Sequence, residues 1–162
     1  MQYKRFEDLP VWREAADLAH LTFEFTASDS FRRHPGLRDQ LERAALSVSN
    51  NIAEGFERGT TNELLAFLYI ARGSAGEVRS MVRLLESWDL FGNCKSQISN
   101  LIQRCERISK QLYGWIEQLK KSGIAGQRHL DEKKRTAYTN RKEREEFLDE
   151  LGRLTAKPPK ET

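Results

Sequence analysis

The chain has 162 residues, of which 31% are charged, and a formal net charge of +3 at pH 7. This length suits one domain followed by a further segment, and the few prolines and glycines favour long helices over many short strands. No run of about 18 apolar residues is present and the N-terminus lacks a signal-peptide core, so we expect a cytoplasmic protein without a membrane span.

Two amphipathic helices are predicted in the first third of the chain. The first runs from about Leu9 to Thr26, with Asp8 as the expected N-cap and Pro10 in the first turn, where its missing N–H costs nothing. The second runs from about Leu37 to Glu54, and Gly55 is the expected stop signal. Both segments carry apolar residues at helical spacing, so each helix has one face to bury.

Two longer helices follow. Thr60 and Glu63 form a capping-box pattern at the start of the third helix, which is expected to end near Asp89. The fourth helix is predicted from about Lys95 to Lys121. Four long helices joined by short loops predict an all-α fold, an antiparallel up-down-up-down four-helix bundle formed by residues 1–122.

Residues 123–162 are predicted to form a charged, partly disordered tail, because Lys and Arg alternate there with Asp and Glu and apolar residues are few. Residues 140–154 carry three apolar side chains at helical spacing and so can form one more short helix. A solvated, fraying segment is the favoured alternative.

Two glycines interrupt the apolar repeat of the third helix. Gly73 and Gly76 each cost roughly 1 kcal/mol relative to alanine in a helix interior. Close helix packing inside the bundle would explain them, and this is the favoured interpretation. The alternative is that they let another subunit approach the helix backbone.

A row of polar residues flanks the apolar face of the second helix. We expect these side chains to form a half-buried hydrogen-bonded network with the third helix, in which Arg43 pairs with Glu54 or Glu77. A catalytic role is disfavoured because Ser47 has no histidine near it in the sequence. The predicted network comprises Gln40, Arg43, Ser47, Asn51, Glu54 and Glu77.

Basic residues recur along the third and fourth helices. Arginines can bind phosphates through two parallel hydrogen bonds, so these residues are candidates for contacts with nucleic acid. A solvated face of mixed charge is the alternative, since Glu77 and Glu86 lie nearby in the sequence. Aromatic residues interleaved with the cations are not expected, because the tryptophans fall at core or rim positions. The candidate nucleic-acid-binding residues are Arg72, Arg79, Arg83, Arg104, Arg107 and Lys110.

No pattern predicts a metal site, a cofactor or an enzyme. The three histidines are scattered, and Cys94 and Cys105 are too far apart on one helix for a disulfide and have no CxxC partner. Phosphate-binding loops and dinucleotide fingerprints are also missing.

Three segments resemble a known bacterial family. They are residues 6–12 (FEDLPVW), 40–55 (QLERAALSVSNNIAEG) and 67–77 (FLYIARGSAGE). They are similar to the four-helix-bundle proteins encoded by intervening sequences in 23S ribosomal RNA genes. The resemblance implies a homopentamer arranged as a barrel, and no enzyme activity. A related branch serves diversity-generating retroelements as a basic accessory protein that binds nucleic acid and a reverse transcriptase.

Together these features predict a non-enzymatic, ring-forming bundle that binds RNA or DNA through repeated basic faces. Its expected partners are further copies of itself, nucleic acid and a protein such as a reverse transcriptase. The alternative is a protein-interaction scaffold with no role in nucleic-acid binding. Fivefold repetition would strengthen a weak basic patch. RNA binding by such a ring should depend steeply on salt concentration, whereas a scaffold should not bind RNA.

Overall fold

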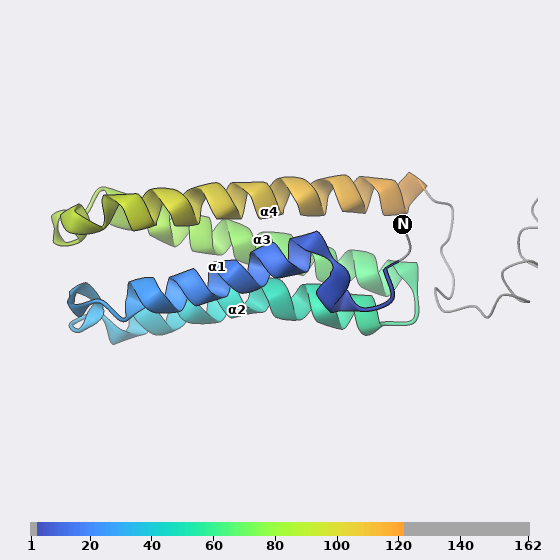
Figure 1. The fold of residues 1–162 in the computed structure, drawn as a ribbon, viewed down its shortest axis with the longest axis horizontal. Helices are drawn as coiled ribbons and strands as arrows, with labels where there is room; N and C mark the ends of the chain where they lie inside the picture. The colour runs from blue at the N-terminus through green and yellow to red at the C-terminus, as the bar shows by residue number, and fades with distance from the viewer. Residues whose placement is uncertain (1–2, 122–162) are drawn as a thin grey trace, which may run out of the picture. The chain divides into compact units, whose positions relative to one another are not determined.

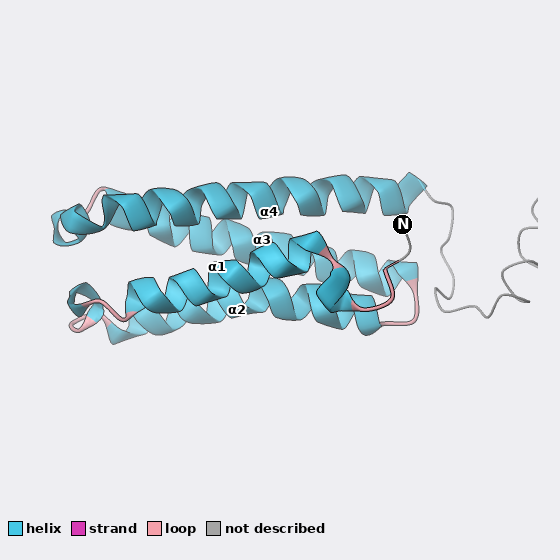
Figure 2. Cartoon of the chain, in the orientation of Figure 1, coloured by secondary structure: helices cyan, strands magenta, loops and turns pink. Residues whose placement is uncertain are grey.

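The computed structural model describes residues 3–121, which form four long helices and contain no strand (Figures 1 and 2). Three short 3₁₀ segments lie before α1, between α1 and α2, and between α3 and α4. The long helices are α1 (Pro10–Thr26), α2 (Pro35–Glu57), α3 (Thr61–Glu86) and α4 (Lys95–Lys121). The 3₁₀ segments are η1 (Phe6–Asp8), η2 (Asp29–Phe31) and η3 (Asp89–Cys94).

Each helix packs against two neighbours, because α1 and α3 both contact α2 and α4. Contacts between α2 and α3 establish their relative direction. Gln40 donates a hydrogen bond to Glu77 at 3.3 Å, and two turns further along α2, Ser47 meets Ser74 at 2.9 Å. Residue numbers therefore fall on α3 as they rise on α2. The predicted all-α fold is confirmed, with helices arranged as expected for an antiparallel bundle.

The core lies along the axis between the four helices. Each helix has an apolar face at helical spacing, and burial of these faces is the main stabilising term of the bundle. One end is closed by rings: Phe31 packs edge-to-face against Phe25 and Phe91, with centroids 5.1 and 5.0 Å apart. Fully buried aliphatic side chains along the axis include Leu18, Leu41, Ile52, Leu64, Leu68, Leu85, Leu101 and Ile108.

The helix boundaries match the prediction at α4 and at the end of α1, which begins at Pro10, one residue later than predicted. α2 extends past both of its predicted ends, and α3 ends at Glu86 rather than near Asp89, where η3 begins. Asp8 is not the N-cap of α1: it belongs to η1, and Leu9 occupies the cap position without a side-chain hydrogen bond. By contrast, the N-cap of α3 is confirmed, since the Glu63 N–H donates to the Thr60 hydroxyl at 3.2 Å. Capping by Thr60 satisfies one of the unpaired N–H groups at the start of that helix.

Gly55 does not end α2, which continues to Glu57 and places Phe56 in the core. The glycine is buried where α2 crosses α3. A Cβ at this position would lie 2.7 Å from the Cβ of Phe67 and 3.2 Å from Leu64 Cδ1. The close approach of the two helices therefore requires a residue without a side chain at position 55.

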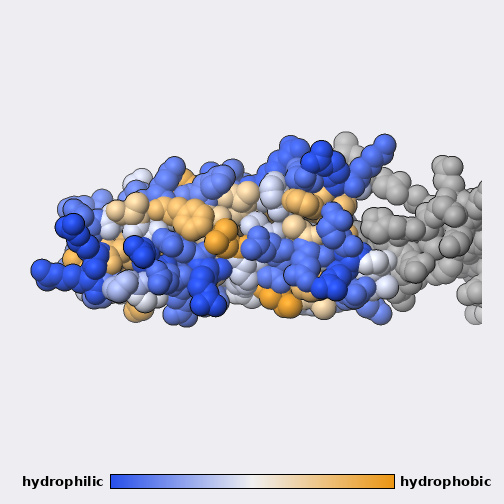
Figure 3. Space-filling view, turned by 90° about the horizontal axis from the view of Figure 1, so that it is seen from below, coloured by the Kyte–Doolittle hydropathy of each residue, from blue (hydrophilic) through white to orange (hydrophobic). Residues whose placement is uncertain are grey.

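The face of the bundle seen in Figure 3 is mostly hydrophilic, with hydrophobic residues in separate islands. No helix among residues 3–121 is long and apolar enough to cross a membrane. The predicted tail of residues 123–162, with its possible helix at 140–154, lies outside the described residues.

Candidate nucleic-acid interface

The six basic residues predicted to bind nucleic acid lie on two different sides of α4. Arg72 and Arg83 of α3 contact side chains of α4, at Tyr113 and Glu106. By contrast, Arg104 and Arg107 of α4 face α1. The sequence analysis treats the six residues as one candidate set, but the bundle places them on separate surfaces.

Arg104 and Arg107 are engaged by carboxylates of α1. Arg104 Nη1 lies 3.2 Å from Glu14 Oε1 and 3.5 Å from Asp17 Oδ2, while Arg107 Nη2 lies 2.8 Å from the same Glu14 oxygen. Arg104 is half-buried, so these charge-assisted hydrogen bonds hold α1 against α4. The positive charge on this side is largely compensated.

The cations near the α3–α4 boundary are less fully compensated. Arg83 pairs with Glu86 at 2.9 Å and with Glu106 at 3.8 Å. In contrast, Arg72, Arg79 and Lys110 form no ion pair with any residue in the described range 3–121. These three residues are therefore the cations of the predicted set that remain available for an anionic ligand.

Two exposed tyrosines lie among these cations. The guanidinium of Arg72 lies over the ring of Tyr113, 5.1 Å from its centroid, and Lys120 Nζ lies 5.6 Å from the centroid of Tyr69. Hydrogen bonding, first to Tyr69 and then to Glu117, raises the pKa of Lys120. The α3–α4 seam is the surface formed by Tyr69, Arg72, Arg79, Lys110, Tyr113 and Lys120.

The expectation that aromatic residues do not interleave with the cations was therefore wrong. It considered the tryptophans, whereas the aromatic residues of the seam are tyrosines. A sequence signal was present: Tyr69 precedes Arg72 by three residues and Lys110 precedes Tyr113 by three, so each pair shares a helix face. Only the antiparallel pairing of α3 with α4 brings the two pairs together.

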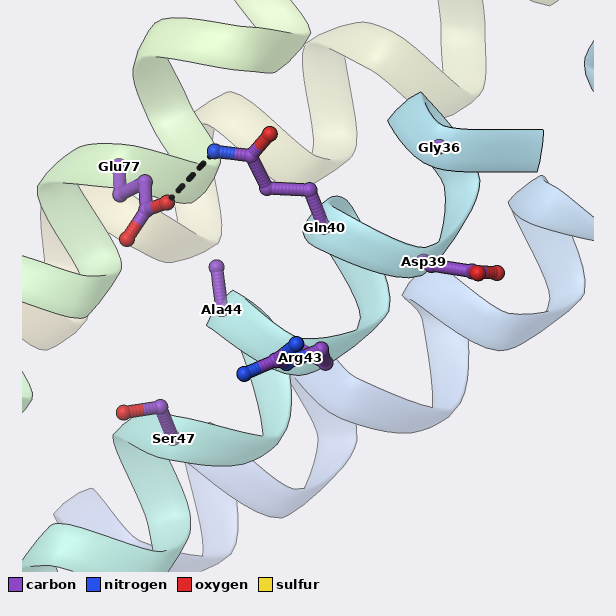
Figure 4. Close-up of a pocket in the computed structure, with 7 residues that line it drawn as sticks. All are labelled: Gly36, Asp39, Gln40, Arg43, Ala44, Ser47 and Glu77. Atoms are coloured by element: carbon purple, nitrogen blue, oxygen red, sulfur yellow. Dashed lines mark hydrogen bonds between the residues drawn. The ribbon is translucent and has the colours of Figure 1, made fainter. Parts of the chain in front are cut away.

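The predicted polar network lies on the opposite flank of α3, against α2. Ser47 is at its centre: its hydroxyl bonds to Ser74 at 2.9 Å and accepts from Asn51 Nδ2 at 2.9 Å. A groove of about 540 Å³ runs beside it, and Figure 4 shows Gln40 reaching across to Glu77. The groove is lined by Gly36, Asp39, Gln40, Arg43, Ala44, Ser47 and Glu77.

Arg43 does not form either of the predicted ion pairs. Glu77 accepts from Gln40 instead, and Glu54 pairs with Arg58, the C-cap residue directly after α2. Arg43 is exposed, and an exposed ion pair gains little over two hydrated charges. The network that forms on this flank is thus made mainly of neutral hydroxyl and amide groups.

Gly73 and Gly76 do not serve close packing inside the bundle. Apart from its chain neighbours and the backbone of its own helix, a Cβ built at either glycine meets no atom of residues 3–121 within 4 Å. Two large apolar side chains of the same helix are also exposed: Ile70 retains 51% of its accessible surface and Leu84 retains 64%. We refer to Ile70, Gly73 and Leu84 as the outer face of α3, a surface that no other helix of residues 3–121 covers.

The described residues provide little for catalysis or metal binding. The Ser47 hydroxyl bonds to a serine and an amide, and neither can act as a general base. Burial raises the pKa of the Cys105 thiol to about 12, which leaves it protonated and unreactive at neutral pH. No cluster of three or more His, Cys, Asp or Glu side chains suited to a metal ion occurs within residues 3–121.

Comparison with known proteins identifies a family. A family model described as 23S rRNA-intervening sequence protein matches residues 7–114. The matched segment spans α1, α2, α3 and most of α4, and so includes the polar network and every residue of the seam except Lys120. No curated protein matches the chain.

Proposed function

The chain belongs to the 23S rRNA-intervening sequence protein family, and on that premise we propose that it is a non-enzymatic, ring-forming bundle that binds RNA through the α3–α4 seam. One observation carries the proposal. Three cations of the predicted set, Arg72, Arg79 and Lys110, lack a carboxylate partner within residues 3–121. Such charges attract the phosphates of nucleic acid, and the family name connects such proteins with ribosomal RNA genes.

Self-association is supported by the outer face of α3. Gly73 costs about 1 kcal/mol of helix propensity relative to alanine, a cost that the close approach of a second copy would offset. Ile70 lies about one turn before Gly73 and Leu84 about three turns after it, and a second copy would remove their apolar surface from water. A closed ring would repeat the seam around one axis. The three weak contacts that each chain makes with RNA would then act together as a multivalent surface.

RNA binding is tested by titrating a labelled RNA with the full chain at several salt concentrations. We expect the Arg72→Gln/Arg79→Gln/Lys110→Gln variant to bind weakly and to lower the slope of log K against log salt by about two per chain. A charge-matched control replaces Arg13, Arg38 and Arg58 by glutamine, all on α1 or at α2. Equal losses in both variants would point to net charge rather than to the seam.

Ring formation is tested by size-exclusion chromatography with light scattering and absorbance at 260 and 280 nm. Five chains of 18.8 kDa would have a mass of about 94 kDa. That mass with excess absorbance at 260 nm supports an RNA-binding ring. The same mass without RNA binding at low salt would favour the alternative, a protein-interaction scaffold with no role in nucleic-acid binding. A monomer would contradict the ring.

A further inference from the structure

The tyrosines of the seam are unusual for side chains of a bundle helix. Tyr69 retains 45% of its accessible surface and Tyr113 retains 53%, although every other large ring on α3 and α4 is at least half-buried in the bundle. Neither ring belongs to the apolar core. Their burial therefore contributes little to the fold, and the exposed part of each ring remains available to a ligand.

Each ring is held in place by a cation from the facing helix. Arg72 of α3 covers Tyr113 of α4, and Lys120 of α4 approaches Tyr69 of α3. These contacts cross the seam in both directions and restrict the rings before any ligand binds. A planar guanidinium on an aromatic ring also offers a second flat surface, on which a nucleobase can stack.

The spacing along the seam suits a polynucleotide strand. Arg72 lies over Tyr113 and so marks the position of that ring along α3. Tyr69 and Arg72 are separated by about 4.5 Å of helix rise. Stacked nucleotides advance by about 3.4 Å per step along one strand. Two neighbouring bases can therefore meet the two stacking positions.

The charged residues around the two stacking positions favour the binding of phosphates. Arg79 lies two turns beyond Arg72 on α3, and Lys110 lies one turn before Tyr113 on α4; both remain without an ion pair in residues 3–121. The carboxylates of the seam are already used, because Glu117 pairs with Lys120 at 2.9 Å and Glu106 with Arg83 at 3.8 Å. Phosphates of a bound strand would thus meet positive charge beside the stacked bases.

From this arrangement we propose that the α3–α4 seam binds single-stranded RNA by stacking unpaired bases on Tyr69 and on the Arg72–Tyr113 pair, and so prefers a single strand to a duplex. A duplex keeps its bases stacked on one another and presents only its backbone to the cations. The inference rests on the proposed function and adds to it the class of RNA that is bound.

The experiment measures fluorescence anisotropy of a labelled, non-self-complementary RNA of about twelve nucleotides, alone and annealed to its complement, with the full chain. We expect tighter binding of the single strand. The Tyr69→Leu/Tyr113→Leu variant should lose about tenfold in single-strand affinity for each ring and leave duplex binding unchanged. The Tyr69→Phe/Tyr113→Phe variant keeps both rings and should bind as the parent does.

Thermal melting of the variants shows whether the fold is intact. Because both rings are exposed, we expect no loss in melting temperature. Equal affinity for single strand and duplex, or a phenylalanine variant as weak as the leucine variant, would overturn stacking. If the arginine and lysine substitutions still weakened binding in that case, the proposed function would stand without this inference. Absence of RNA binding at low salt would remove both.

Discussion

The two flanks of α3 use different physical chemistry. Toward α2, the flank is closed: Gly55 lets the helices approach, and the Ser47 hydroxyl bonds to Ser74 in a largely buried position. Toward α4, the flank is open and charged, with Tyr113 and Arg72 in contact at the surface. A helix that is fixed on one flank can present long, hydrated side chains on the other without losing its position in the bundle.

The largest effect that we predict is the protection of a buried thiol from chemical modification in the core beneath the open flank. Burial raises the pKa of the Cys105 thiol to about 12, although the positive charge of Arg79 acts in the opposite direction. At pH 8 about one Cys105 in ten thousand is then a thiolate. Iodoacetamide should modify the half-buried Cys94 of the native protein and spare Cys105, as peptide mass spectrometry would show. Guanidinium-unfolded protein, in which both should react, is the control.

The closed flank should respond strongly to one methyl group. Gly55→Ala places a Cβ 2.7 Å from Phe67 Cβ, an atom fixed next to the α3 backbone. We expect a loss of about 1–3 kcal/mol in the free energy of unfolding, measured by urea denaturation. This loss opposes the usual gain in helix propensity on replacing glycine by alanine. A stabilised variant would show that α2 and α3 can separate without cost.

Removing a hydroxyl from the closed flank should have a smaller effect. Ser74→Ala breaks the bond to Ser47, whose hydroxyl keeps Asn51 as a partner. We expect a loss of about 1 kcal/mol in unfolding free energy. Ser80→Ala, on an exposed turn of the same helix, controls for the change in helix propensity. Identical values for the two variants would mean that the serine pair contributes nothing.

The smallest effect, with the opposite sign, is expected on the outer face. The methyl group of Gly73→Ala meets no atom of the other helices in residues 3–121 within 4 Å, so the substitution should raise the unfolding free energy of the dilute chain by about 0.5–1 kcal/mol. The same methyl group should hinder the approach of a second copy and lower the mass measured by light scattering. A stabilised variant with an unchanged mass would place self-association on another surface.

Much of the fold could be predicted because periodicity is a local property. The apolar repeats predicted all four helices, the capping box at Thr60 was correct, and Lys95–Lys121 was predicted to the residue. Errors arose where the same residue type occurs both at helix ends and in other structural settings. Gly55 has the pattern of a helix stop and Asp8 that of a cap, but packing against α3 and the η1 turn override these local preferences.

The candidate site divides in the same way. Sequence alone determined which residues are cations, which positions share a helix face and that Ser47 belongs to a polar row. Only the tertiary structure decided which cations are compensated, since Glu14 is about 90 residues from Arg104 and Arg107. It also decided that Gly55, rather than Gly73 or Gly76, is the glycine of close packing. The reason is physical: charge compensation and steric contact depend on distance in space, which the pairing of helices sets and the spacing along one helix does not.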